Sequence, residues 1–251
     1  MPIIGIDYEK CTNCNICLSA CPDPERYIKR DEEQNKIIFE DPQKRCILCG
    51  QCIAQCPEDA ILYEGMGQSF TFESIENLKK VVSYDNLFNF LASLRSIRHY
   101  KKENVPIELL NKVFKAMQYA ATGANMKSEN YSLISNPQTI EALSNAVLEE
   151  LLKDPSTKDQ WEKQFERLKK MYRIPIYFDA PHVIFVSSPF NMMIEGFNIG
   201  NIITYGRLAA QALGLGTCWN GWTQLAIQKN PKIKNAHKNP LENRGAFFTL
   251  L

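Results

Sequence analysis

Apolar and polar positions follow two rhythms along this chain. Apolar residues three and four positions apart indicate amphipathic helices, whereas short continuous apolar runs between turn residues indicate buried strands. The first rhythm predicts helices over residues 86–94, 106–117, 140–152, 161–171 and 196–213. The second predicts strands over residues 37–39, 60–63, 131–134, 180–186 and 246–251. Helices mixed with few strands imply an α+β sandwich in the larger, C-terminal part of the chain rather than a helical bundle.

A polar interval divides the chain. Residues 64–82 lose the apolar periodicity around Gly65 and Gly67, so we expect a linker there with room for one short helix. The expected organisation is a small module over 1–65, a linker over 66–83 and a second domain over 84–251.

The composition is that of an ordinary soluble globular protein. The 251 residues are 45% hydrophobic and 23% charged, and this length suits one small module plus a larger domain with its own core. No run of eighteen apolar residues is present, which excludes a membrane span. The residues before Cys11 carry neither a basic segment nor a long apolar segment, so the protein is predicted to be cytoplasmic.

The net charge of +1 conceals an asymmetry. Residues 1–65 hold seven Lys and Arg against twelve Asp and Glu, a balance of −5 that leaves +6 for the remainder. A basic second domain is expected if it docks an acidic module and binds a phosphorylated cofactor. Scattered surface charge explains the same balance equally well.

Eight of the nine cysteines fall in two runs of the same spacing. Each run reads C-x2-C-x2-C-x3-C-P, the first from Cys11 to Cys21 and the second from Cys46 to Cys56. Four thiolates at this spacing, followed by proline, are the bacterial pattern that ligates [4Fe-4S] clusters, with the fourth cysteine directed to the other cluster. A structural zinc site uses four sulfurs in all, and a disulfide framework needs an oxidising compartment. We therefore expect two clusters that move single electrons.

The module over residues 1–65 resembles a two-cluster bacterial ferredoxin. The predicted ligands of cluster I are Cys11, Cys14, Cys17 and Cys56. The predicted ligands of cluster II are Cys46, Cys49, Cys52 and Cys21.

Three segments of the second domain carry candidate binding chemistry. Arg95 and Arg98 lie just after a predicted helix, and arginine forks suit a phosphate or the edge of a pyrimidine ring. Residues 120–127 end a helix in a turn that contains Thr, Gly and Asn. Residues 212–222 follow the apolar helix with a glycine-rich loop.

Together with Asp179-Ala180-Pro181, these segments resemble the FMN-dependent nitroreductase family from about residue 84 to the end. That family carries R-S-x-R, A-P-[ST]-G-x-N, D-A-P and A-L-G-L-G-T-x-W-x-G, and this chain carries the four segments in the same order. The resemblance implies a nitroreductase-like α/β sandwich that holds FMN at a homodimer interface. The apolar helix over 196–213, rich in small residues, suits a buried or interface position.

The resemblance also implies which residues contact FMN. Arg95, Ser96 and Arg98 would contact the phosphate, the ribityl chain and the pyrimidine edge. Backbone groups of Asn220 and Gly221 would lie near flavin N5 and O4. No side chain is assigned a catalytic role, because flavin N5 carries the chemistry.

The turn over residues 121–125 has its own implied role. Asn125 would bond the flavin from its loop, while Thr122 and Gly123 would approach from the partner subunit. Here Ala121 replaces the usual proline and Lys127 the usual glutamine, which affects substrate contacts more than flavin contacts. The family continues past its last strand with a basic tail that helps to hold the phosphate, so we expect that contact to be missing or the sequence to be incomplete.

Several other noticeable residues have structural explanations. Cys218 is expected to be a core thiol, Trp219 and Trp222 either wall a flavin pocket or are buried, and the histidines are structural or on the surface. These histidines are His99, His182 and His237.

The combined modules predict an FMN-dependent oxidoreductase. An external low-potential donor, ferredoxin-like or NAD(P)H, would supply electrons through the clusters to FMN, which would reduce a small acceptor such as a nitroaromatic or a quinone. Two alternatives stay open: a dedicated oxidoreductase for one metabolite, and an electron-transfer subunit that serves a partner protein. No nucleic acid or membrane partner is expected.

Overall fold

The computed structural model of the chain describes residues 3–64, 78–189, 193–236 and 247–250. The chain divides into two compact units, Met1–Val81 with Ala124–Lys127 and Val82–Gly123 with Ser128–Leu251. The short helix α4 (Leu78–Val81) lies within the predicted linker. The predicted limits at residues 65 and 84 stay a prediction, since residues 65–77 lie outside the described part.

The first unit is built from short elements. They are β1 (Ile3–Ile6), α1 (Ile16–Ala20), α2 (Pro24–Tyr27), β2 (Ile28–Asp31), β3 (Lys36–Phe39), α3 (Gln51–Ala54) and β4 (Ile61–Tyr63). Antiparallel pairs join β1 to β4 and β2 to β3. The predicted strands over 37–39 and 60–63 are confirmed as β3 and β4. β1 and β2 were not predicted, because Gly5 interrupts the apolar run of β1 and charged residues follow Ile28 in β2.

The second unit contains longer helices and one sheet. Its elements are α5 (Tyr84–Ala92), α6 (Ile107–Met117), β5 (Asn130–Ile134), α7 (Pro137–Leu151), α8 (Lys158–Lys169), β6 (Val183–Ser187), α9 (Met193–Ala212), β7 (Trp219–Asn220), α10 (Gly221–Lys229), η2 (Pro231–Ala236) and β8 (Phe247–Leu250). The short turn η1 (Gly123–Asn125) begins in this unit and continues into residues assigned to the first. All five predicted helices are confirmed as α5 to α9. Side-chain caps fix several starts, as where Asn136 Oδ1 accepts from Thr139 N (2.9 Å) at the start of α7.

The predicted strand over 180–186 begins three residues later, at Val183. Phe178 and Asp179 take left-handed backbone angles, with φ of 55° and 57°, and Pro181 has no N–H to donate to a neighbouring strand. The sheet therefore starts only after this turn. The remaining predicted strands are confirmed as β5 and β8, although residues 246 and 251 lie outside the described part.

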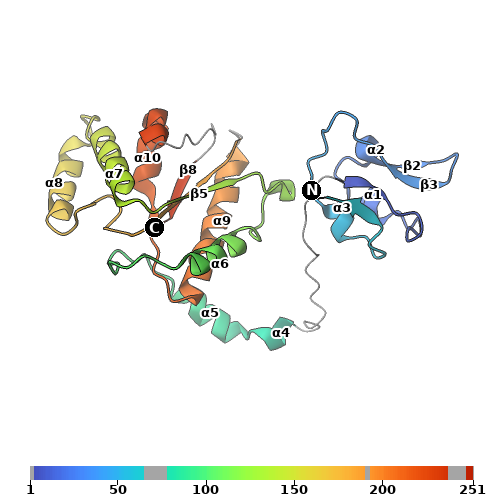
Figure 1. Cartoon of the computed structure of the whole chain (residues 1–251), viewed down its shortest axis with the longest axis horizontal. Helices are drawn as coiled ribbons and strands as arrows, with labels where there is room; N and C mark the ends of the chain where they lie inside the picture. Colours follow the sequence, from blue (N-terminus) through green and yellow to red (C-terminus); the bar gives the residue numbers. More distant parts are fainter. Residues whose placement is uncertain (1–2, 65–77, 190–192, 237–246, 251) are drawn as a thin grey trace. The chain divides into compact units, whose positions relative to one another are not determined.

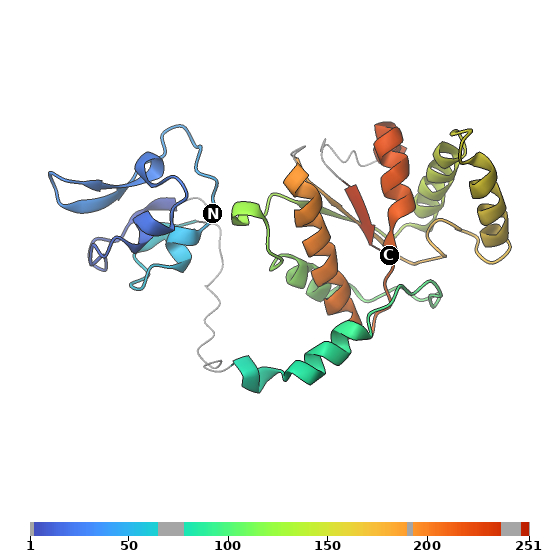
Figure 2. The same cartoon turned by 180° about the vertical axis from the view of Figure 1, so that it is seen from behind.

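Antiparallel strands in the order β5-β6-β8-β7 form the sheet, and helices cover both of its faces. Side chains alternate along β6, so Val183 and Phe185 pack with α7 and α10 while Ile184 and Val186 pack with α6 and α9. The second unit in Figure 1 and Figure 2 shows these layers on either side of the sheet. The α+β sandwich expected from the sequence is confirmed.

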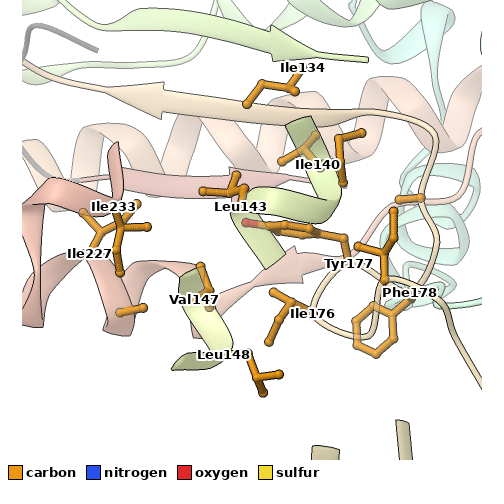
Figure 3. Packing of buried hydrophobic residues seen from close by; sticks show 14 of the residues in the cluster. Ile134, Ile140, Leu143, Val147, Leu148, Ile176, Tyr177, Phe178, Ile227 and Ile233 are labelled. Carbon is orange, nitrogen blue, oxygen red and sulfur yellow. The ribbon is translucent and has the colours of Figure 1, made fainter. Parts of the chain in front are cut away.

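Tyr177 anchors the core on the α7 and α10 side. It is fully buried and lies among Ile140, Leu143 and Ile176 (Figure 3). Its hydroxyl forms a hydrogen bond with Thr223 Oγ1 at 2.9 Å, so its polar end has a partner. This contact ties the turn before β6 to the first residues of α10.

Two helices present apolar side chains to the outside of the single chain. Every residue of α5 is at least partly exposed, including Tyr84 (76%), Phe88 (54%) and Leu91 (45%). On α9, Met193 (85%) and Phe197 (65%) are exposed although other positions of the helix are buried. The helical spacing predicted the helices, but it did not predict that these faces lack cover within one chain.

Within the described residues, we find no helix with the length and hydropathy of a membrane span.

Candidate functional site

Two cavities in the first unit are each lined by four thiols. The thiols around the first cavity are those of Cys11, Cys14, Cys17 and Cys56. The thiols around the second are those of Cys21, Cys46, Cys49 and Cys52. Each cavity therefore receives three thiols from one cysteine run and the fourth from the other run. The crossed pairing expected from the sequence requires this grouping, while the ligand assignment itself stays a prediction.

The two cysteine loops share an unusual backbone. Asn13 and Asn15 have φ of 57° and 64°, and the equivalent residues of the second run, Leu48 and Gly50, have φ of 55° and 71°. Left-handed angles are accessible to glycine and tolerated by asparagine, but they are uncommon for leucine. The residues between successive cysteines thus wind both loops in the same way and turn three thiols toward one cavity.

Hydrogen bonds hold the second cysteine loop in place. The Asp41 carboxylate accepts from Arg45 N (2.8 Å) and Cys46 N (2.9 Å). The Tyr27 hydroxyl donates to Arg45 O at 2.8 Å. In the loop that supplies the crossing thiol, Ala60 N donates to Cys56 Sγ at 3.3 Å. Backbone N–H groups that point at sulfur would also stabilise a metal-bound thiolate.

The electrostatics of the thiols fit a metal–sulfur centre. Burial raises the pKa of Cys52 to about 12, and burial also raises the pKa of Cys17 and of Cys21. Cys49 and Cys46 add to the rise at Cys21, which places this thiol beside the second run. Such thiols ionise when a metal takes the place of the proton. Among the described residues, no three Cys, His, Asp or Glu side chains are grouped closely enough to hold a single metal ion.

In the second unit, two of the predicted binding segments lie against each other. Ile97 N donates to Thr217 O at 2.9 Å. This bond joins residues 95–98, called the arginine segment below, to the glycine-rich loop. A Cβ atom on Gly216 would lie 2.8 Å from Ile97 Cγ2 and 3.0 Å from Ile97 Cβ. Only glycine therefore lets the two segments approach this closely.

Arg95, Ser96 and Arg98 of the arginine segment are exposed. Arg95 Nη1 donates to Ala92 O (2.7 Å) and Leu94 O (2.8 Å), so this side chain closes the end of α5. The Arg98 guanidinium lies over the Phe178 ring, 5.6 Å from its centroid. Within the described residues, neither arginine forms an ion pair with a carboxylate. Both keep donors for an anionic ligand.

The turn before β5 rests on the first half of α9. Gly123 N donates to Asn198 Oδ1 at 2.8 Å, and Asn201 Nδ2 donates to Ala121 O at 3.2 Å. A Cβ atom on Gly123 would meet Ile194 Cδ1 at 3.0 Å. Asn198 and Asn201 are polar residues on a mostly apolar helix. This pattern could have indicated that they support the turn, but it was not predicted.

The rest of the predicted turn has an unusual backbone. Asn125 continues it with φ of 52°, and Lys127 has φ of 48°. Thr122 is half-buried, and Lys127 is exposed.

Asn220 and Gly221 form the start of α10. The Asn220 side chain is buried, where Nδ2 donates to Ile176 O (2.6 Å) and Oδ1 accepts from Thr223 N (3.0 Å). Its amide is therefore fully used inside the fold, which leaves only its backbone for a ligand. Gly221 is exposed, and a Cβ atom there would meet nothing within 4 Å. These residues were predicted to lie in a loop, and the helix that they start was not predicted.

Cys218 and Trp222 both belong to the hydrophobic core of the second unit. Cys218 is 2% exposed and lies in the core, as predicted. Trp222 packs against Phe165 (5.3 Å between centroids) in the same core, so burial accounts for it.

The histidines are structural or on the surface where the structure describes them, as expected. His182 accepts from Val105 N (3.0 Å) and pairs with Ser135 Oγ (2.7 Å), and burial lowers its pKa. His99 is exposed, and His237 lies outside the described residues.

Comparison with known proteins identifies the larger unit. The model of the nitroreductase family matches residues 91–238, more than half of the chain. The chain belongs to the nitroreductase family. A second model, the 4Fe-4S dicluster domain, matches residues 3–57. The chain thus joins a 4Fe-4S dicluster module over residues 3–57 to a nitroreductase-family domain over residues 91–238.

Solved structures agree with this assignment. The chain is similar to a nitroreductase with bound FMN from Bacteroides fragilis NCTC 9343, with a TM-score of 0.57 and 20% identity over 65% of this chain and 85% of that one. It is also similar to a nitroreductase with bound FMN from Desulfitobacterium hafniense DCB-2, with a TM-score of 0.56 and 22% identity over 65% of this chain and 86% of that one. At these identities the likeness establishes the fold.

The first module has relatives of its own. It is 37% identical over 60 residues to NADH-quinone oxidoreductase subunit I 2 of Geobacter metallireducens, which covers 22% of this chain and 46% of that protein. The chain spans less than half the length of the curated relatives that it matches. The [4Fe-4S] clusters predicted for the first module agree with the 4Fe-4S dicluster model.

Proposed function

We propose that this chain is an oxidoreductase in which the first unit accepts single electrons from an external low-potential donor and the second unit uses them to reduce a small acceptor. Nitroaromatics and quinones are the acceptor classes that we expect. The observation that carries the proposal is the presence of two cavities lined by four thiols each in the same chain as a nitroreductase-family domain.

The proposal assigns a task to each group of residues. The eight thiols would hold two [4Fe-4S] clusters, in the crossed sets that the cavity linings support. In the second unit, Arg95, Ser96 and Arg98 would bind the phosphate, ribityl chain and pyrimidine edge of FMN. When bound, the clusters supply one-electron transfer and the flavin converts it into two-electron reduction.

The chain's own residues contribute position rather than bond-making chemistry. The Asn220 side chain fixes the start of α10, so that the backbone there and at Gly221 can face the flavin. The Asn198 amide fixes the turn at Gly123, which we expect to serve the flavin site together with Thr122. Ordering these groups before the ligand arrives lowers the entropic cost of binding it.

We also propose that the second unit forms a homodimer. Support comes from the exposed apolar side chains of Tyr84, Phe88 and Leu91 on α5 and of Met193 and Phe197 on α9. Exposed apolar side chains grouped on one helix are typical of protein interfaces.

Phe88→Glu is therefore expected to shift the protein from dimer to monomer in sedimentation velocity, because it places a charge in a desolvated contact. Met171 is 61% exposed and follows α8, so Met171→Glu is the matched control and should leave the mass unchanged. A wild-type protein that sediments as a monomer at all concentrations would contradict the dimer.

Composition analysis tests the proposed cofactors most directly. Anaerobically purified protein is expected to contain about eight iron atoms and about eight sulfides per chain, the content of two cubane clusters, together with one released FMN per chain. The measurement is iron and sulfide quantitation combined with flavin release. Zinc in place of iron would contradict the proposal, and so would protein that takes up no flavin when FMN is added.

A further inference from the structure

One arginine interrupts the apolar sequence of α9. Buried residues flank Arg207 along this helix, with Ile203 and Gly206 before it and Ala210 after it. Its Nε atom is buried and has no hydrogen-bond partner. Within the described part of the chain, its guanidinium forms no ion pair. A desolvated donor on a cation is costly unless something accepts from it, so this position calls for an anionic partner.

The helix geometry directs Arg207 toward the arginine segment. Gln211 lies four residues later and therefore on the same face of α9. Its Nε2 atom donates to Phe90 O and to Ser93 Oγ, both at 2.8 Å. Ser93 lies two residues before Arg95, so this face of α9 adjoins the chain that enters the arginine segment.

A second contact brings the same elements together from the other side. Tyr100 and Ala210 line one small cavity of the second unit, and Ala210 lies one turn beyond Arg207. Burial raises the pKa of Tyr100, while the positive charges of Arg98 and Arg207 act against this rise. Within the described residues, neither arginine has a carboxylate partner.

We propose that Arg207 binds the phosphomonoester group of the flavin together with Arg95, the residue expected at the phosphate, and that it sets the preference for phosphorylated over unphosphorylated flavin. The inference rests on the proposed function, because it takes FMN as the ligand of the second unit. A phosphate dianion would accept charge-assisted hydrogen bonds from the guanidinium groups of Arg95 and Arg207 and would satisfy the buried Nε donor of Arg207. Riboflavin carries the same ring and ribityl chain without the phosphate, so it offers no partner to Arg207.

The test compares the two flavins on the full chain. Flavin-free protein with its clusters retained is titrated with FMN and with riboflavin, and flavin fluorescence reports binding. Arg207→Ala is expected to weaken FMN binding by about 10- to 100-fold, the range for loss of a charge-assisted hydrogen bond, and to leave riboflavin binding within about twofold. Arg207→Lys keeps the charge but loses the fork, so a smaller selective loss is expected. Arg167→Ala, on an exposed position of α8, should change neither affinity.

Each outcome separates the inference from the function on which it rests. Equal weakening of FMN and riboflavin in both Arg207 variants would show that Arg207 serves packing, and unchanged FMN binding in both would show that it serves no ligand. Either result overturns the inference while FMN remains the ligand. If the wild-type protein binds neither flavin, the proposed function fails, and the inference falls with it.

Discussion

Replacement of Cys14 by alanine is expected to lower turnover driven by a reduced ferredoxin by at least about 100-fold, the upper end of the effect of losing an outer-shell partner of a metal. Iron content should fall from about eight to about four atoms per chain, because one cubane loses a ligand. FMN content should stay the same, because Cys14 lies in the first unit. The measurements are anaerobic turnover with a nitroaromatic acceptor and metal quantitation on the same sample.

The ninth cysteine provides the matched control. Cys218 is buried in the core of the second unit and lines neither thiol cavity, so Cys218→Ala should keep the full iron content and the ferredoxin-driven rate. Chemical reduction of the flavin by dithionite should be equally complete in Cys14→Ala and in wild-type protein. If Cys14→Ala loses four irons yet turns over at the wild-type rate with ferredoxin, electrons do not enter through this cluster.

Gly216→Ala is expected to weaken FMN binding by about tenfold. The new Cβ atom would lie 2.8 Å from Ile97 Cγ2 and 3.0 Å from Ile97 Cβ, and overpacking of this kind costs about 1–3 kcal/mol. Because Ile97 stands between Ser96 and Arg98, its displacement moves the predicted ribityl and pyrimidine contacts. The measurement is the dissociation constant of FMN from flavin-free protein.

A second substitution decides whether the contact is the cause. Ile97 is 41% exposed, so it can be shortened at little cost. Ile97→Ala removes the 2.8 Å contact with Cγ2 but keeps Cβ, so combined with Gly216→Ala it should recover part of the lost FMN affinity. Gly196→Ala is the control, because a Cβ atom at Gly196 meets nothing within 4 Å. Failure of the double variant to recover affinity would show that Gly216 acts through something other than its contact with Ile97.

The local pattern of apolar residues predicted most of the secondary structure. The helices α5 to α9 and the strands β5 and β8 follow from apolar spacing within a few residues, because each signal lies inside its own segment. The start of α10 was missed, since its cap is Asn220 and the preceding residues read as a glycine-rich loop. The late start of β6 was missed as well, because left-handed angles at Phe178 and Asp179 are not encoded by a periodic pattern.

For the candidate site, sequence supplied the residues and the structure supplied their neighbours. The spacing of eight cysteines predicted two clusters and the exchange of Cys21 and Cys56, because ligand spacing is itself a local property of the chain. Four ordered segments likewise predicted a nitroreductase-family domain, which the family model confirms.

Tertiary structure alone decided what stands beside those residues. It placed Thr217 against Ile97, used up the Asn220 side chain inside the fold, and left the apolar faces of α5 and α9 uncovered. It also brought Gln211 to Phe90 and Ser93, more than a hundred residues away along the chain. Contacts between such distant residues depend on how helices cross a sheet, and periodicity along one segment carries no information about that crossing. The sequence by itself therefore determined which cofactor chemistry this protein is built for, and the packing of α9 against its neighbours determined which side chains are free to meet the ligand.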